Sequence, residues 1–253
     1  RTLTKAEATR RRGWWLASTG VICGTGLGIL AKENAAVLPV LILVVEWMGV
    51  RPLWQQQLST RIERLWFLVF ILIPSIALLA YLGYKARFGS FFELGGHRLF
   101  TPYERIITQP GILLDYLYDL LIPKPGYAGL YQENYPFARS LISPPTALIN
   151  LILITTLIGI AVWFRKRFPL VVLALLFFLA GHLIESTILM LELKFEHRNY
   201  LPAALLFLPI AAAIVLGLPR FRWVIGILLV ALLATFTFNY AALWGHPVEL
   251  AVY

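Results

Sequence analysis

Long apolar stretches alternate with short polar ones along the whole chain. Seven of the apolar stretches approach the roughly 20 residues that a helix needs to cross a bilayer. The second stretch is short and directly follows the polar triplet Lys32-Glu33-Asn34, so the first two predict a tight helical hairpin that turns at this triplet. The predicted spans are residues 14–31, 35–50, 65–84, 145–164, 168–189, 201–218 and 223–244.

One further segment, residues 104–122, is apolar on one side only. On a helical wheel its polar residues gather on one face, which is typical of a helix that lies in the membrane interface. These residues are Glu104, Thr108, Asp115 and Asp119. We expect this interfacial helix on the outer side, broken or started at Pro110.

The composition agrees with a membrane protein. Of the 253 residues, 59% are hydrophobic and only 14% are charged, whereas an ordinary soluble domain carries about 25% charged residues. A typical soluble enzyme, a disordered chain and a coiled coil are therefore excluded. The predicted fold is an all-α, polytopic membrane helical bundle with about seven spans and one interfacial amphipathic helix. We treat residues 1–253 as a single transmembrane domain, with an outer loop and the interfacial helix in 85–144.

The net charge of +9 is explained by membrane topology. Lys and Arg concentrate in cytoplasmic loops, and four basic clusters fall on one side if the N-terminus is cytoplasmic. That side holds thirteen of the 22 basic residues and three acids, whereas the other side is almost neutral. The lipid bilayer is therefore the expected partner and nucleic acid is not. The C-terminus and the Lys32-Glu33-Asn34 turn are expected outside.

Two features of the first hairpin have alternative interpretations. Gly24-Thr25-Gly26-Leu27-Gly28 superficially resembles a nucleotide-binding loop, but the spacing of four between Gly20, Gly24 and Gly28 on an apolar helix favours close helix packing. Lys32 and Glu33 lie where two spans meet, and charges at such a depth usually face a cavity or each other. Lys32 either meets an anionic group such as a lipid phosphate, or forms a neutral pair that caps the turn.

Polar residues also gather before the sixth span, in Glu196-His197-Arg198-Asn199-Tyr200. Arg198 could hold a phosphate through two parallel hydrogen bonds, and His197 could move a proton near neutral pH. The alternative is an ordinary interfacial loop. His182 and Glu185 could likewise be functional or form a structural pair. Asp115 and Asp119 could bind a cation or an acceptor, or form a solvated face. The single cysteine and the His spacing predict no metal site.

Three stretches together resemble a known family. They are Leu30–Asn34 with Val37-Leu38-Pro39 and Glu46-Trp47; Tyr103–Arg105 with Thr108-Gln109-Pro110, Leu113-Leu114 and Tyr116-Leu117; and Glu196–Pro202. In order and spacing the chain is similar to bacterial membrane proteins that join a multi-span GT-C-type glycosyltransferase region to tetratricopeptide (TPR) repeats. It resembles the eukaryotic transmembrane-and-tetratricopeptide O-mannosyltransferases more distantly.

The resemblance implies a GT-C-like fold and a transferase that uses a polyprenyl-phosphate sugar. The acceptor, a protein or a glycan, would be modified on the non-cytoplasmic face, and a bacterial inner membrane is the expected location. Lys32 and Arg198 would neutralise the departing phosphate. The other residues would orient these two basic groups or the sugar, line the donor entry, or contact the sugar or the acceptor. The implied substrate-binding residues are Lys32, Glu33, Asn34, Arg105, Gln109, Glu196, His197, Arg198 and Tyr200. Such enzymes can use a divalent cation, for which no ligand set stands out.

The chain departs from the family at its beginning. Family members carry a catalytic acidic motif in their first outer loop, whereas the first outer polar residues here are Lys32-Glu33-Asn34. We therefore expect the central-to-C-terminal membrane part of a longer enzyme, with the catalytic residue outside this sequence. The alternative is a non-enzymatic integral membrane subunit or anchor of a larger complex, derived from the same fold. A transporter is disfavoured because no inverted halves are visible.

Overall fold

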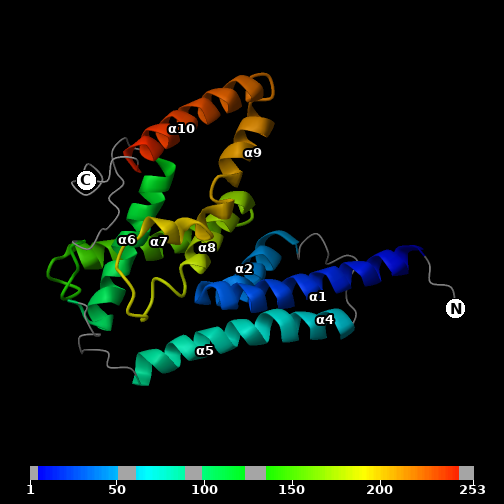
Figure 1. The fold of residues 1–253 in the computed structure, drawn as a ribbon, viewed down its shortest axis with the longest axis horizontal. Coiled ribbons are helices and arrows are strands. Elements are labelled where there is room, and N and C mark those ends of the chain that lie inside the picture. Colours follow the sequence, from blue (N-terminus) through cyan, green and yellow to red (C-terminus); the bar gives the residue numbers. More distant parts are fainter. Residues whose placement is uncertain (1–4, 51–60, 89–98, 123–134, 245–253) are drawn as a thin grey trace. The chain divides into compact units, whose positions relative to one another are not determined.

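The computed structural model describes residues 5–50, 61–88, 99–122 and 135–244 (Figure 1). Within these ranges every regular element is helical, as the sequence predicts. Contacts divide the chain into two compact units, Arg1–Gly89 with Leu183–Glu185, and Ser90–His182 with Ser186–Tyr253. Residues 89–98 and 123–134 of the predicted outer loop, and the predicted outer C-terminus at 245–253, lie outside the described residues. That the units form one transmembrane domain stays a prediction.

The first unit begins with a helical hairpin. Helix α1 (Lys5–Ala31) ends at Lys32, whose extended backbone (φ −158°, ψ 132°) reverses the chain into the 3-10 helix η1 (Glu33–Val37). Helix α2 (Leu38–Val45) and the π-helical turn η2 (Glu46–Val50) follow. Pro39 in the first turn of α2 suits a helix start, because its missing N–H would have no partner there. The predicted hairpin turn at Lys32-Glu33-Asn34 is confirmed.

Two of the three α1 glycines that are spaced by four residues bring the hairpin's arms together. A Cβ added at Gly28 would lie 2.6 Å from the Cβ of Ala35, and one at Gly24 would lie 3.2 Å from Cδ2 of Leu38. The expected close packing is therefore confirmed at Gly24 and Gly28. It is wrong at Gly20, where an added Cβ would meet nothing within 4 Å. The reason is geometric, since the arms contact only near the turn.

A second long helical stretch lies beside α1, as the blue and cyan ribbons of Figure 1 show. It comprises α4 (Arg61–Phe67), the π-helical turn η3 (Leu68–Leu72) and α5 (Ile73–Phe88). The widened turn ends two residues before Pro74, which lacks the N–H of a regular helical bond. The Trp66 indole donates to Oγ of Ser18 at 2.8 Å and meets the Trp14 ring edge-on at 5.1 Å. Both contacts fasten this stretch to α1.

The second unit contains the remaining helices. They are α6 (Pro102–Leu121), α7 (Thr146–Phe164), α8 (Pro169–Gly181), η4 (Glu196–Asn199), η5 (Pro202–Leu205), α9 (Leu208–Gly217) and α10 (Arg222–Trp244).

Two glycines allow close packing between elements of this unit. A Cβ added at Gly111 would lie 2.6 Å from Nδ2 of Asn150, and one added at Gly181 would lie 2.8 Å from Cγ of Pro202. The core cluster is Phe100, Ile112, Tyr116, Phe178 and Leu193.

Four helices in the described residues are long and apolar enough to cross a membrane, namely Arg12–Ala31, Arg64–Arg87, Thr146–Phe164 and Arg222–Asn239. Pro169–Gly181 and Pro202–Gly217 are shorter apolar helices. Apolar side chains of α10 face outward, such as Ile227 and Phe238 at 66% and 73% exposed, which suits contact with lipid. The predicted span 168–189 is wrong in its second half, because α8 ends at Gly181.

The glycine contacts predict a contrast between substitutions on one helix. Gly28→Ala should destabilise the chain by about 1–3 kcal/mol, because the new methyl overlaps Ala35. Gly20→Ala and Gly26→Ala are matched controls with open space, and their unfolding midpoints should be unchanged or slightly higher. Thermal unfolding of the full chain in detergent measures all three. Equal effects at Gly28 and Gly20 would contradict the packing described here.

Candidate functional site

Helix α6 carries side chains of the candidate site, and hydrogen bonds to capping residues fix its N-terminus. Thr101 accepts a hydrogen bond from the Glu104 N–H at 3.2 Å, and the Glu104 carboxylate accepts one from the Thr101 N–H at 2.7 Å. This reciprocal capping box starts the helix at Pro102. The prediction that the helix is broken or started at Pro110 is therefore wrong, since α6 runs through Pro110.

Buried polar side chains on α6 hold the irregular backbone that follows α8. Arg105, fully buried, donates from Nε to the Thr187 carbonyl at 3.2 Å and from Nη1 to the carbonyls of Leu191 and Glu192. One turn later, Gln109 Nε2 donates to the Leu193 carbonyl at 3.4 Å. Buried carbonyls outside a helix or sheet must find such donors. The side chains of Arg105 and Gln109 therefore determine the backbone path of residues 187–193.

The ring of Tyr116 continues this face of α6. Its hydroxyl bonds both the N–H and the carbonyl of Phe195, and its ring stacks on His182 with centroids 5.3 Å apart. His182 Nε2 in turn lies 3.2 Å from Oδ1 of Asn199. The end of α8 is thereby tied to η4. The Glu185 carboxylate meets Lys32 of its own unit, and that His182 and Glu185 form a structural pair stays a prediction.

A buried lysine neutralises the acidic pair at the C-terminal end of α6. Lys194 Nζ lies 2.9 Å from Asp119 Oδ2 and 3.9 Å from Asp115 Oδ2, with its side chain only 4% exposed. Tyr135 donates to Asp115 at 2.8 Å. The cation that the two acids bind is therefore a side chain of their own chain. Sequence reasoning missed Lys194; the signal was an acid pair at spacing four, which is unfavourable without a cation.

The residues from Glu196 to Tyr200 divide into a buried and an exposed set. Arg198 is 5% exposed and pairs with the Glu192 carboxylate at 3.0 Å, while also donating to the Glu192 carbonyl. Glu196, His197 and Tyr200 are exposed, and Tyr200 reaches 92%. The His197 ring rests edge-on against Phe195, 4.4 Å between centroids. Arg198 thus stabilises the turn that presents the three exposed side chains.

The surroundings of Glu196 shift the pKa of its carboxyl group. Neighbouring protein displaces water from it, which raises its pKa above the ordinary value; Lys194 opposes this shift and Asp119 adds to it. The group therefore takes up a proton at a higher pH than a fully solvated glutamate does.

The predicted site at the first turn belongs to the first unit. Lys32 Nζ lies 2.8 Å from Oε1 of Glu185, whose side chain is 4% exposed, whereas the Lys32 side chain is 48% exposed. Glu33 is exposed and Asn34 is buried. Among the described residues, Oδ1 of Asn34 has no hydrogen-bond partner. The lysine is thus in an ion pair, as one of the two interpretations held, but the partner is Glu185 and not the adjacent Glu33.

The nine implied site residues therefore fall into two physical classes. Four are buried and bonded or packed inside a unit: Asn34, Arg105, Gln109 and Arg198. Five are exposed: Lys32, Glu33, Glu196, His197 and Tyr200. The second unit brings Arg105, Gln109 and Arg198 to one stretch of backbone. That any of the nine binds a substrate stays a prediction.

No family model, curated protein or solved structure matches this chain. Across the described ranges, no group of three or more His, Cys, Asp or Glu is placed to hold a metal ion. A function must therefore be inferred from the chain's own residues and contacts.

The contacts of Arg105 predict a large stability effect. Arg105→Ala should lower the free energy of unfolding by about 3 kcal/mol or more, because it leaves the carbonyls of Thr187 and Leu191 without their charged donor and that of Glu192 with Arg198 alone. Arg139→Ala is a matched control, because Arg139 is an exposed arginine of the same unit, and it should change stability little. Denaturant unfolding in detergent micelles measures both. Similar losses at Arg105 and Arg139 would rule out this role for Arg105.

Proposed function

We propose that the chain is the membrane part of a glycosyltransferase that moves a sugar from a polyprenyl-phosphate donor to a protein or glycan acceptor on the non-cytoplasmic face. The observation that carries the proposal is the polar arrangement of the second unit. An irregular segment is bonded to α6 through Arg105, Gln109 and Tyr116, and it presents Glu196, His197 and Tyr200 to solvent.

The hydrogen bonding of this segment and the exposed groups at its end support a role in binding a sugar. Irregular backbone beside apolar helices is tolerated only where it is buried in protein or lines a water-filled cavity. Here the backbone is satisfied by buried donors, while the side chains at its end are solvated. Carboxylate, imidazole and phenol groups can hydrogen-bond sugar hydroxyls. The two stretches that form the arrangement are also two of the three that resemble the GT-C-type transferases.

The buried and the exposed residues have different roles in the proposed enzyme. The buried Arg105, Gln109 and Arg198 are positioning residues, which act through the backbone and Glu192. Lys32, which is half-exposed, meets the donor phosphate and stabilises the charge that develops as it leaves. Glu196, His197 and Tyr200 contact sugar or acceptor.

Substitution of Lys32 tests whether this lysine binds the donor phosphate, and a double variant provides the control. Lys32→Ala in the full-length protein should reduce sugar transfer at least tenfold, because it removes the phosphate's cation. The substitution also leaves the buried Glu185 without this lysine, so the double variant Lys32→Ala/Glu185→Gln should be made alongside. Transfer is measured in membranes containing equal amounts of inserted protein.

If Lys32 binds the donor, the double variant stays as inactive as the single one. Recovery of wild-type transfer in the double variant would show that Lys32 serves only as the partner of Glu185.

The raised pKa of Glu196 predicts a pH dependence. An ionised carboxylate accepts hydrogen bonds from hydroxyls more strongly than the protonated carboxyl does, so KM should rise as pH falls through the raised pKa, with kcat changing less. In Glu196→Gln this acid limb of the KM profile should disappear, because the amide does not titrate. An identical acid limb in both proteins would remove Glu196 from the proposed site.

The second candidate function is a non-enzymatic membrane subunit or anchor. It is favoured by the four described helices that are long and apolar enough to cross a membrane, which would suffice for an anchor. A full-length protein without any transferase activity toward polyprenyl-phosphate sugars, yet required for assembly of a membrane complex, would establish it.

A further inference from the structure

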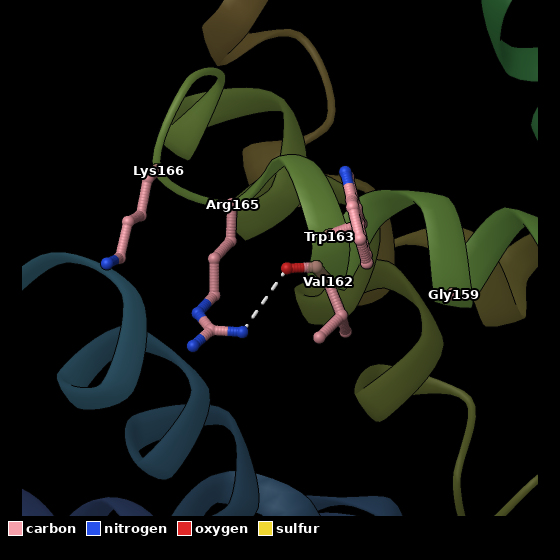
Figure 2. A pocket seen from close by; sticks show the side chains of 5 residues that line it. All are labelled: Gly159, Val162, Trp163, Arg165 and Lys166. Atoms are coloured by element: carbon pink, nitrogen blue, oxygen red, sulfur yellow. Dashed lines mark hydrogen bonds between the residues drawn. The ribbon is translucent and has the colours of Figure 1, made fainter.

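A groove lies at the end of helix α7, away from the polar site described above. It has a volume of about 420 Å³ and is lined by Gly159, Val162, Trp163, Arg165 and Lys166 (Figure 2). In the view of Figure 2, the side chains of Arg165 and Lys166 extend toward the same side. A Cβ added at Gly159 would meet nothing within 4 Å, so the helix surface is notched one turn before Trp163.

The length of α7 places this groove at the level of lipid headgroups. The candidate span Thr146–Phe164 has 19 residues, which at 1.5 Å each is about 28 Å, close to the roughly 30 Å hydrocarbon core. Trp163 is 83% exposed, and tryptophan prefers the membrane–water interface. Arg165 and Lys166 therefore stand just beyond the hydrocarbon, where lipid phosphates lie, while Gly159 and Val162 stand within it.

The local charge favours an anionic ligand. Arg165, Lys166 and Arg167 are consecutive, and the sequence has no acidic residue between Glu133 and Glu185. The C-terminus of α7 contributes only about half a negative charge, and the start of α8 at Pro169 offsets it. Arg165 Nη1 donates to the Val162 carbonyl at 3.3 Å, which orients its guanidinium along the groove.

We propose that this groove binds an anionic phospholipid, with its headgroup phosphate beside Lys166 and Arg165 and the start of one acyl chain in the notch at Gly159. The occupant is a lipid and not a free phosphate, because the groove joins a basic end to an apolar one at a span's boundary. The indole of Trp163 lies between the two ends at the depth of the ester groups.

The test titrates lipids onto the detergent-solubilised full chain and follows retention by native mass spectrometry. Phosphatidylglycerol should bind more tightly than phosphatidylcholine. Lys166→Gln should weaken phosphatidylglycerol binding about fivefold, the usual worth of one basic residue at a membrane surface. Gly159→Leu fills the notch without changing charge and should weaken binding by a similar factor. Arg222→Gln is the matched control, since Arg222 likewise lies at one end of a candidate span near a tryptophan but does not line the groove.

Three outcomes would overturn the proposal. They are equal retention of the two lipids, displacement of phosphatidylglycerol by inorganic phosphate, and an Arg222→Gln effect as large as that of Lys166→Gln, which would indicate a general surface charge. Unfolding midpoints confirm that each variant is folded. If Lys166→Gln fails to fold, Gly159→Leu still decides, because unchanged phosphatidylglycerol binding by that variant contradicts the notch.

Discussion

The second unit depends on how one stretch of non-helical backbone obtains its hydrogen bonds. Between Gly181 and η4 the chain passes among apolar helices without a regular ladder of its own. An unsatisfied peptide group in apolar surroundings costs several kcal/mol. Arg105 supplies donors to three carbonyls and Tyr116 satisfies both polar groups of Phe195. The path of this segment, and so the position of Glu196 to Tyr200, follows from side chains about 80 residues earlier.

Much of the helical fold could be predicted from the sequence, because apolar runs and glycine spacing are local signals. The turn at Lys32 followed from charges between two apolar runs, and Gly24 and Gly28 followed from spacing alone. The end of α8 at Gly181 could not be found by hydropathy, since apolar residues continue beyond it. The helix ends there because His182 hydrogen-bonds to η4, and the backbone that follows accepts a hydrogen bond from α6.

The candidate site was less predictable than the helices. Polar residues of the second and third stretches lie together in the second unit, but the partner of each could not be predicted. A wheel of α6 shows Asp115 and Asp119 as one acidic face; it cannot show that Lys194 returns to neutralise them. Similarly, the sequence suggests Arg198 as a phosphate ligand and Arg105 as part of the donor entry, whereas carbonyls and Glu192 surround them in the structure. Such long-range partners depend on tertiary packing.

The buried polar groups bear on the choice between a transferase and an anchor. Burying Arg105, Lys194 and Arg198 carries a desolvation cost that hydrogen bonds and ion pairs only partly offset, so such groups are weak evidence for stability. An anchor needs only apolar helices, which would pack without this cost. What the polar groups do provide is a single defined path for residues 187–200, with Glu196, His197 and Tyr200 held outward at its end. Fixed placement of exposed polar side chains is what substrate recognition requires, and it favours the transferase over the anchor.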